Sequence, residues 1–167
     1  MSFLDLPWIS AIRHNHALEH ATVHVLTRRF PHVDVVGRSG SGGFVIYGAI
    51  ETEALEQAVQ EALARLKAGE RHLAVHPRCG TQLSTAGTLA GLAAFGAMLG
   101  KSESRWDKLP GVLLATTLAV IAAQPIGLRV QKQITTAPDV EGVRITGITR
   151  QERGKIVIHR VKVHNPL

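Results

Sequence analysis

A cluster of histidines near the start of the chain has the spacing of a metal-binding helix. The run His14-Asn-His16-Ala-Leu-Glu19-His20 places His16 and His20 four residues apart. Residues four apart share one face of an α-helix, so both imidazoles can reach one metal ion. Glu19 lies beside that face, in the HxxEH arrangement whose glutamate acts as general base toward water. The alternative is an amphipathic helix whose histidines are half-buried or solvated.

A catalytic metal site also needs a third protein ligand and one open position. Cys79 is the only cysteine in the chain, and its deprotonated sulfur would complete a His-His-Cys set with His16 and His20. That donor set accepts zinc or ferrous iron. The alternative for Cys79 is a small buried hydrophobic residue. A single cysteine also excludes an intramolecular disulfide.

The elements that must position these residues follow from periodicity and turn signals. Two helices and three short strands are expected, in the order helix 8–29, strand 33–36, strand 44–48, helix 51–68 and strand 72–76. A glycine-rich mobile loop, 37–43, joins the first two strands. The last strand leads directly into the turn that contains Cys79. These elements would place Cys79 within reach of the histidine helix.

Two uncharged stretches of twenty residues follow Cys79, at 81–100 and 109–128. Each has the length of a helix that crosses a lipid bilayer. Glycines recur in the first stretch at the spacing that lets membrane helices approach closely, at Gly87, Gly91, Gly96 and Gly100. We expect a two-helix transmembrane hairpin, with a buried helix pair in a soluble core as the alternative.

The excess of basic residues, 19 against 13 acidic ones, is concentrated around this hairpin. Its outer ends carry more of them than the connector does: Lys67, Arg71, Arg78, Arg129 and Lys132, against Lys101, Arg105 and Lys108. The positive-inside rule then predicts an integral membrane protein with both termini and the metal-binding domain in the cytoplasm. Aromatic and basic residues are not interleaved, so no nucleic-acid groove is expected.

The C-terminal part of the chain reads as a β-hairpin, with strands 143–149 and 155–163 around a turn at 151–154. We therefore expect an α+β fold in which a small sheet packs on helices. The transmembrane hairpin is inserted before the C-terminal β-hairpin, which completes the first domain. The expected domains are 1–80, 81–128 and 129–167.

These features, in this order, resemble S-ribosylhomocysteine lyase, the autoinducer-2 synthase. The resemblance covers about residues 14–82 and rests on HxLEH at 16–20, on Gly43-Phe44 and on Cys79-Gly-Thr81. It implies an α+β sandwich shared with the inverted-zincin peptidases and an active site at a homodimer interface. It also implies His16, His20 and Cys79 as metal ligands and Glu19 as the acid/base. The chain also looks like an uncharacterised family of small bacterial membrane proteins that share HALEHA and HPxCGT signatures.

One departure from the lyase pattern shapes the expected reaction. The lyases carry a second, catalytic cysteine just before the Gly-Phe pair, where this chain has Ser39-Gly-Ser-Gly-Gly43. We therefore expect a membrane-anchored, mononuclear metal-dependent hydrolase of amide or peptide bonds, with Glu19 as general base. The sequence does not indicate a particular substrate.

Two other functions stay open. One is a lyase or isomerase that acts on a thioether-linked sugar. The other is a non-catalytic, zinc-stabilised accessory subunit of a membrane complex. In that case a protein side chain fills the fourth metal position, and His76 and His24 are the candidates. His24 continues the helical series but drifts off the metal-binding face.

Overall fold

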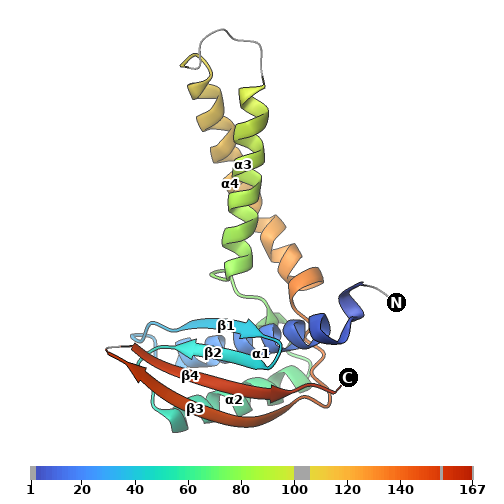
Figure 1. Ribbon diagram of the computed structural model, residues 1–167, viewed down its shortest axis with the longest axis vertical. Helices are drawn as coiled ribbons and strands as arrows, with labels where there is room; N and C mark the ends of the chain where they lie inside the picture. Colours follow the sequence, from blue (N-terminus) through green and yellow to red (C-terminus); the bar gives the residue numbers. More distant parts are fainter. Residues whose placement is uncertain (1–2, 100–105, 155, 167) are drawn as a thin grey trace. The chain divides into compact units, whose positions relative to one another are not determined.

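The computed structural model describes residues 3–99, 106–154 and 156–166. Their contacts define two compact units, Met1–His76 with Lys132–Leu167, and Pro77–Gln131. The first unit contains a sheet covered by helices, and the second contains two long helices (Figure 1). The predicted α+β class is confirmed, with one four-stranded antiparallel sheet.

The N-terminal helix α1 spans Pro7–Arg29 and follows the sequence pattern closely. Proline is favoured at the first helical position because it needs no hydrogen-bond acceptor there. Ala17, Leu18, Ala21 and Leu26 are fully buried and form the face that packs on the sheet and on α2 (Thr52–Lys67). Helix α1 is therefore a core element, and His20 is among its buried residues.

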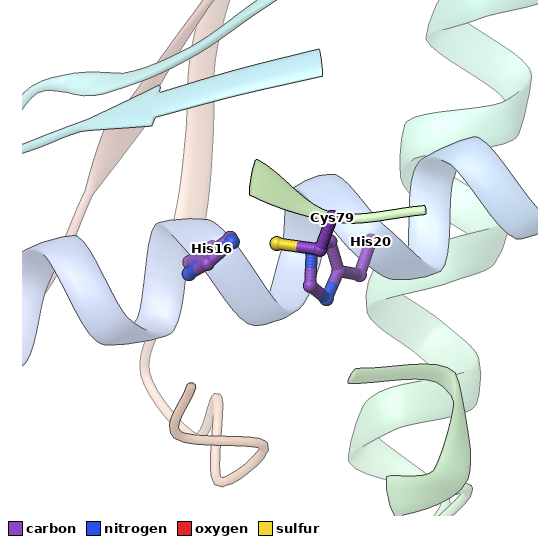
Figure 2. A group of neighbouring side chains, drawn as sticks. All are labelled: His16, His20 and Cys79. Atoms are coloured by element: carbon purple, nitrogen blue, oxygen red, sulfur yellow. The ribbon is translucent and has the colours of Figure 1, made fainter. Parts of the chain in front are cut away.

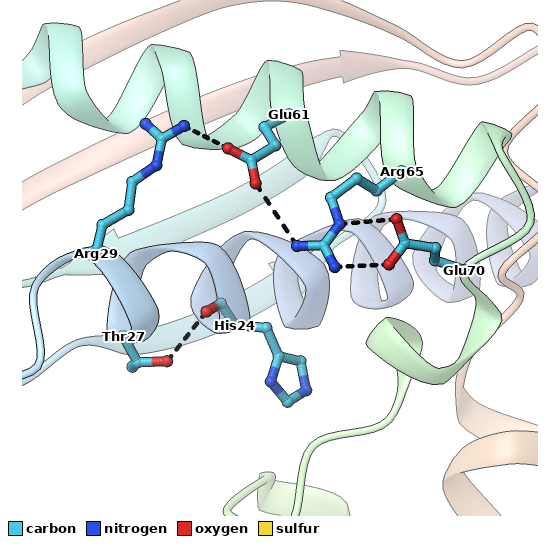
Figure 3. Close-up of polar contacts among 6 residues, drawn as sticks. All are labelled: His24, Thr27, Arg29, Glu61, Arg65 and Glu70. Atoms are coloured by element: carbon cyan, nitrogen blue, oxygen red, sulfur yellow. Dashed lines mark hydrogen bonds and ion pairs between the residues drawn. The ribbon is translucent and has the colours of Figure 1, made fainter.

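A chain of ion pairs connects α1 to α2 on their outer surface (Figure 3). Arg29 at the end of α1 pairs with Glu61 of α2. Glu61 also lies 3.6 Å from Arg65, one turn further along α2. Arg65 donates two hydrogen bonds to Glu70, of 2.9 and 2.6 Å. These exposed pairs are individually weak, but they join α1, α2 and the segment that leads toward Cys79.

The sheet has the strand order β1-β2-β4-β3. The strands are β1 (Val36–Gly40), β2 (Gly43–Tyr47), β3 (Arg144–Arg153) and β4 (Ile156–His164). β4 pairs with β2, with Phe44 opposite Val161. The C-terminal hairpin and the N-terminal strands thus belong to one sheet, and α1 and α2 cover one of its faces (Figure 1).

Two predicted loops and two predicted strands are wrong in detail, and the strand expected at 33–36 begins only at Val36. The loop expected at 37–43 is mostly strand β1, with a tight turn at Ser41 and Gly42. The C-terminal turn expected at 151–154 begins later, because β3 extends to Arg153. The strand expected at 72–76 is a short 3-10 helix, Arg71–Ala74. The carbonyls of Ala74 and Val75 accept bonds from histidines of α1 instead of from a neighbouring strand.

The second unit consists of α3 (Gly80–Met98) and α4 (Leu109–Val130), which run antiparallel and side by side (Figure 1). α4 continues into a π-helical turn, Gln131–Thr135. Among the described residues, only the continuous helix Leu109–Thr135 is long and apolar enough to cross a membrane. Just 11% of its most apolar stretch is buried.

The second predicted span is not shown by this criterion. α3 contains a glutamine, a serine and three threonines, which lower its hydropathy. Its glycines are also not where the two helices approach most closely, because a Cβ at Gly87, Gly91 or Gly96 would meet no atom within 4 Å. Close approach occurs at Gly127 of α4, where a Cβ would overlap the side chain of Gln82. Gly100 and the connector residues 101–105 lie outside the described residues.

Candidate metal centre

His16, His20 and Cys79 lie together, as the sequence predicts (Figure 2). One nitrogen of each imidazole and the cysteine sulfur all lie within 4.8 Å of one another. In the described part of the chain, no other set of three or more His, Cys, Asp or Glu side chains is grouped closely enough to hold a metal. The two histidines come from one face of α1, and Cys79 comes from the residue that precedes α3.

Backbone carbonyls determine which imidazole nitrogen is available to a metal. Nδ1 of His20 lies 2.8 Å from the carbonyl oxygen of Ala74, and Nδ1 of His16 lies 3.0 Å from that of Thr135. A carbonyl can only accept, so each Nδ1 carries the proton and donates. Nε2 of both rings therefore keeps its lone pair. This carbonyl-to-imidazole bond is the one that usually orients metal-binding histidines.

The environment of Cys79 favours negative charge on its sulfur. Cys79 is the N-cap residue of α3, and its sulfur accepts a hydrogen bond of 3.4 Å from the backbone N–H of Thr81. The N–H groups at a helix N-terminus carry partial positive charge and stabilise a thiolate. The thiol is half-buried. Two neutral imidazoles and one thiolate form a donor set that suits zinc or ferrous iron.

Glu19 lies beside this group without belonging to it. Its carboxylate oxygen Oε2 is 4.0 Å from Nε2 of His16, and the residue is only 6% exposed. Burial raises the pKa of the Glu19 carboxyl to about 7, and His16 opposes that shift. A cation bound by the neighbouring ligands would also lower this pKa by direct attraction. The role of Glu19 as a general base stays a prediction.

Gly37 of β1 makes room for the Glu19 carboxylate, a role that the sequence analysis missed. A Cβ at Gly37 would overlap the Glu19 carboxyl group and lie 2.7 Å from its Cγ. The sequence suggested a mobile loop at this position, because glycines and serines dominate it. No sequence signal distinguishes a glycine that permits a turn from one that admits a neighbouring side chain.

Asn15 is a second residue whose role the sequence did not reveal. It is fully buried and donates to the carbonyls of Gly40 and Ser41, at 2.7 and 3.2 Å. It also accepts a hydrogen bond from Asn165. The amide therefore ties the turn of α1 that carries His16 to the β1–β2 turn and to the C-terminal strand region.

His24 and His76 lie near the group but outside it. Nε2 of His24 is 2.9 Å from the carbonyl oxygen of Val75. The ring of His76 is 4.9 Å from that of His24 and 5.9 Å from that of His20, measured between centroids. The fourth-ligand role of either histidine stays a prediction.

The fold and the site thus define an α+β protein with a candidate His-His-Cys centre. The chain belongs to the family described as Domain of unknown function (DUF6391), which it matches over residues 11–148. It is similar to an uncharacterized protein of Picosynechococcus sp. (strain ATCC 27264 / PCC 7002 / PR-6), with 40% identity over 136 residues. The aligned region covers 75% of this chain and 66% of that protein. No solved structure matches the chain significantly.

Proposed function

We propose that this protein is a membrane-anchored, mononuclear metal-dependent hydrolase that acts on an amide or peptide bond. The observation that carries the proposal is the convergence of His16, His20 and Cys79 within 4.8 Å, with Glu19 buried beside them. The resemblance to S-ribosylhomocysteine lyase supports the same ligands. The absence of a second cysteine in the sequence argues against the reaction of that lyase.

The chemistry of the donor set fits a catalytic metal. With zinc or ferrous iron bound, the centre would supply a Lewis acid that polarises a carbonyl and makes water more acidic. Glu19 would accept a proton from the attacking water and return it to the leaving amine. The carbonyls of Ala74 and Thr135 hold the two imidazoles in one tautomer throughout. Three protein ligands leave one position for substrate.

The exposed surface of the second unit supports membrane anchoring. Among the described residues, fourteen of the twenty large apolar side chains that are exposed lie within Pro77–Gln131. A core helix of a soluble protein buries such side chains, whereas a lipid-facing helix exposes them. We include α3 as a second span, with both termini cytoplasmic by the distribution of lysine and arginine. The open glycine face of α3 would suit a second copy of the chain.

The test separates metal binding from hydrolysis. The full-length chain, purified in detergent, is assayed for zinc content and for cleavage of a library of internally quenched fluorescent peptides. We expect Cys79→Ser to lose both, and Glu19→Gln to keep zinc while the rate falls at least about 100-fold. Glu56→Gln, an exposed glutamate of α2, is the control. A Glu19→Gln protein as active as the wild type would refute the mechanism.

A non-catalytic, zinc-stabilised subunit is the second candidate, because His76 and His24 lie close to the group. A side chain in the fourth position would make the site structural. This candidate predicts that His76→Ala or His24→Ala weakens zinc binding. The hydrolase proposal predicts that both variants bind zinc with unchanged affinity. A wild-type chain that holds zinc and cleaves no peptide would favour this candidate.

A further inference from the structure

The end of the longest apolar helix is capped by α1. The last carbonyls of a helix have no partner within the helix. At the π-helical turn Gln131–Thr135, the carbonyls of residues 133–136 accept bonds from side chains of α1. Arg13 Nε donates to the carbonyl of Ile134 at 2.8 Å. Its Nη2 donates to the carbonyls of Gln133 and Thr136, both at 3.3 Å. One guanidinium therefore holds three backbone carbonyls.

The carbonyl of Thr135, which lies between these carbonyls, contacts a candidate metal ligand. Thr135 accepts the Nδ1 proton of His16 at 3.0 Å, and it lies between Ile134 and Thr136, whose carbonyls Arg13 binds. A backbone hydrogen bond also joins the two segments, since the N–H of Ala137 donates to the carbonyl of Arg13 at 3.0 Å. Four consecutive carbonyls are thus held by two side chains, one of which is a candidate ligand.

From this arrangement we infer that Arg13 is a positioning residue for the metal centre. Arg13 holds residues 133–136 in place, and the carbonyl of Thr135 then fixes the ring of His16 through Nδ1, which makes Nε2 the nitrogen that would bind the metal. The inference rests on the proposed metal centre. It also couples two features that the sequence analysis treated separately, namely metal binding and the end of the apolar helix Leu109–Thr135.

The physical basis is the geometry of arginine at a helix C-terminus. The carbonyl end of a helix carries partial negative charge, which a cation stabilises. The planar guanidinium can bind several oxygens at fixed angles, whereas a lysine ammonium binds as a flexible point charge. A carbonyl that accepts from Nδ1–H fixes the imidazole and raises the basicity of its other nitrogen. Loss of this contact should therefore weaken the ligand without removing it.

Coupling of this kind is reciprocal. If the helix end helps to orient His16, then metal binding must stabilise the helix end by the same factor. Amide hydrogen exchange in residues 133–139 should therefore slow when zinc is added. This readout reports on the backbone and does not depend on the activity of the protein or on the identity of its substrate.

The experiment uses the full-length chain in lipid nanodiscs. Zinc affinity is measured by competition with a chelating dye, hydrogen exchange is followed by mass spectrometry with and without zinc, and Co²⁺ absorption reports the ligand field. The variants are Arg13→Ala and Arg13→Lys. The control is Arg28→Ala, an exposed arginine in the last turn of the same helix.

We expect Arg13→Ala to bind zinc about 10-fold more weakly, to shift the Co²⁺ bands and to lose the zinc-dependent protection of residues 133–139. Arg13→Lys should recover only part of each effect, and it decides the question if Arg13→Ala does not fold. Wild-type affinity, spectrum and protection in both variants would overturn the inference while the metal centre stands. A wild-type chain that binds neither metal would overturn both.

Discussion

The two units of the molecule treat their apolar residues in opposite ways. In the first unit Leu18, Leu26, Phe44 and Val161 are at most 2% exposed and form a core between sheet and helices. In α3 and α4 together, only a glutamine, an alanine and a glycine are buried. Apolar side chains thus pack against each other in the first unit and are exposed in the second. The difference supports the proposed membrane anchoring of the second unit.

The buried polar groups sharpen the contrast. In the second unit Gln82, a polar residue, is the buried side chain of α3, and it donates to the carbonyls of Ala123 and Gln124. Those carbonyls lie next to Pro125, which interrupts the hydrogen-bonding pattern of α4. Helices whose polar groups bond to each other and whose apolar groups face outward are suited to lipid.

The largest expected effect is the cost of opening the core of the first unit. Leu55 of α2 is fully buried, and Leu55→Ala should lower the free energy of unfolding by about 2–5 kcal/mol. Leu118 of α4 is 56% exposed, and Leu118→Ala should change the same quantity by less than about 0.5 kcal/mol. Urea unfolding, followed by hydrogen exchange in β2, measures both. Equal losses would mean that the second unit has an internal core.

Nearly as large is the cost of a charge on the outer face of α4. Ile121 is 63% exposed, so in water Ile121→Lys would be harmless. In a bilayer, a lysine at the centre of a span costs about 2.5–3.5 kcal/mol. We therefore expect the variant to insert poorly into microsomal membranes in a glycosylation assay, with Ile121→Leu as the control. Unchanged insertion of the lysine variant would remove the membrane interpretation of α4.

Metal removal should lower the stability of the first unit by a comparable amount and leave the middle of α4 unchanged. A ligand that binds only the folded state at 100 times its Kd stabilises that state by about 2.7 kcal/mol. Chelation of zinc should therefore destabilise the first unit, with the loss measured as faster hydrogen exchange in α1 and around Ala74. The middle of α4 should not respond. Cys79→Ser should abolish the zinc-dependent difference, and a response of similar size in the variant would contradict the candidate ligand set.

Hydrophobic periodicity predicted the helices, but it could not predict features that depend on contacts between residues far apart in the sequence. The helices were found within about two residues, because buried apolar positions recur at helical spacing. The grouping of His16, His20 and Cys79 could be predicted, because a histidine pair at helical spacing and a lone cysteine are recognisable in a sequence. The roles of Gly37 and Arg13 could not, since each depends on a residue that only the folded chain brings into contact.

Gly37 provides a smaller and more specific test of the site. Gly37→Ala would place a methyl group where the Glu19 carboxylate lies, so the carboxylate must move. Since a displacement of about 1 Å can reduce catalysis about 100-fold, we expect a large loss of peptide cleavage with unchanged zinc content. Gly42→Ala, at a position where nothing lies within 4 Å, is the control. Wild-type activity in Gly37→Ala would show that the carboxylate position does not matter.

The smallest expected effect is a pH dependence of stability that comes from a buried polar group of the first unit. His159 of β4 is fully buried, with Nε2 3.2 Å from the hydroxyl of Thr52 and, among the described residues, no partner at Nδ1. Burial and Arg150 lower the pKa of His159, whereas Glu51 raises it.

Because this pKa is lower in the folded state, the unfolded chain takes up the proton first, and the stability that the neutral His159 contributes should be lost as the pH falls below about 6.5. Glutamine side chains do not titrate in this range, so the Gln82 contacts of the second unit should not change. His159→Gln should flatten the pH dependence of unfolding in urea, whereas His164→Gln, at an exposed position on the same strand, should not. An unchanged slope in His159→Gln would place the acid sensitivity elsewhere, with the histidines of α1 as the next groups to substitute.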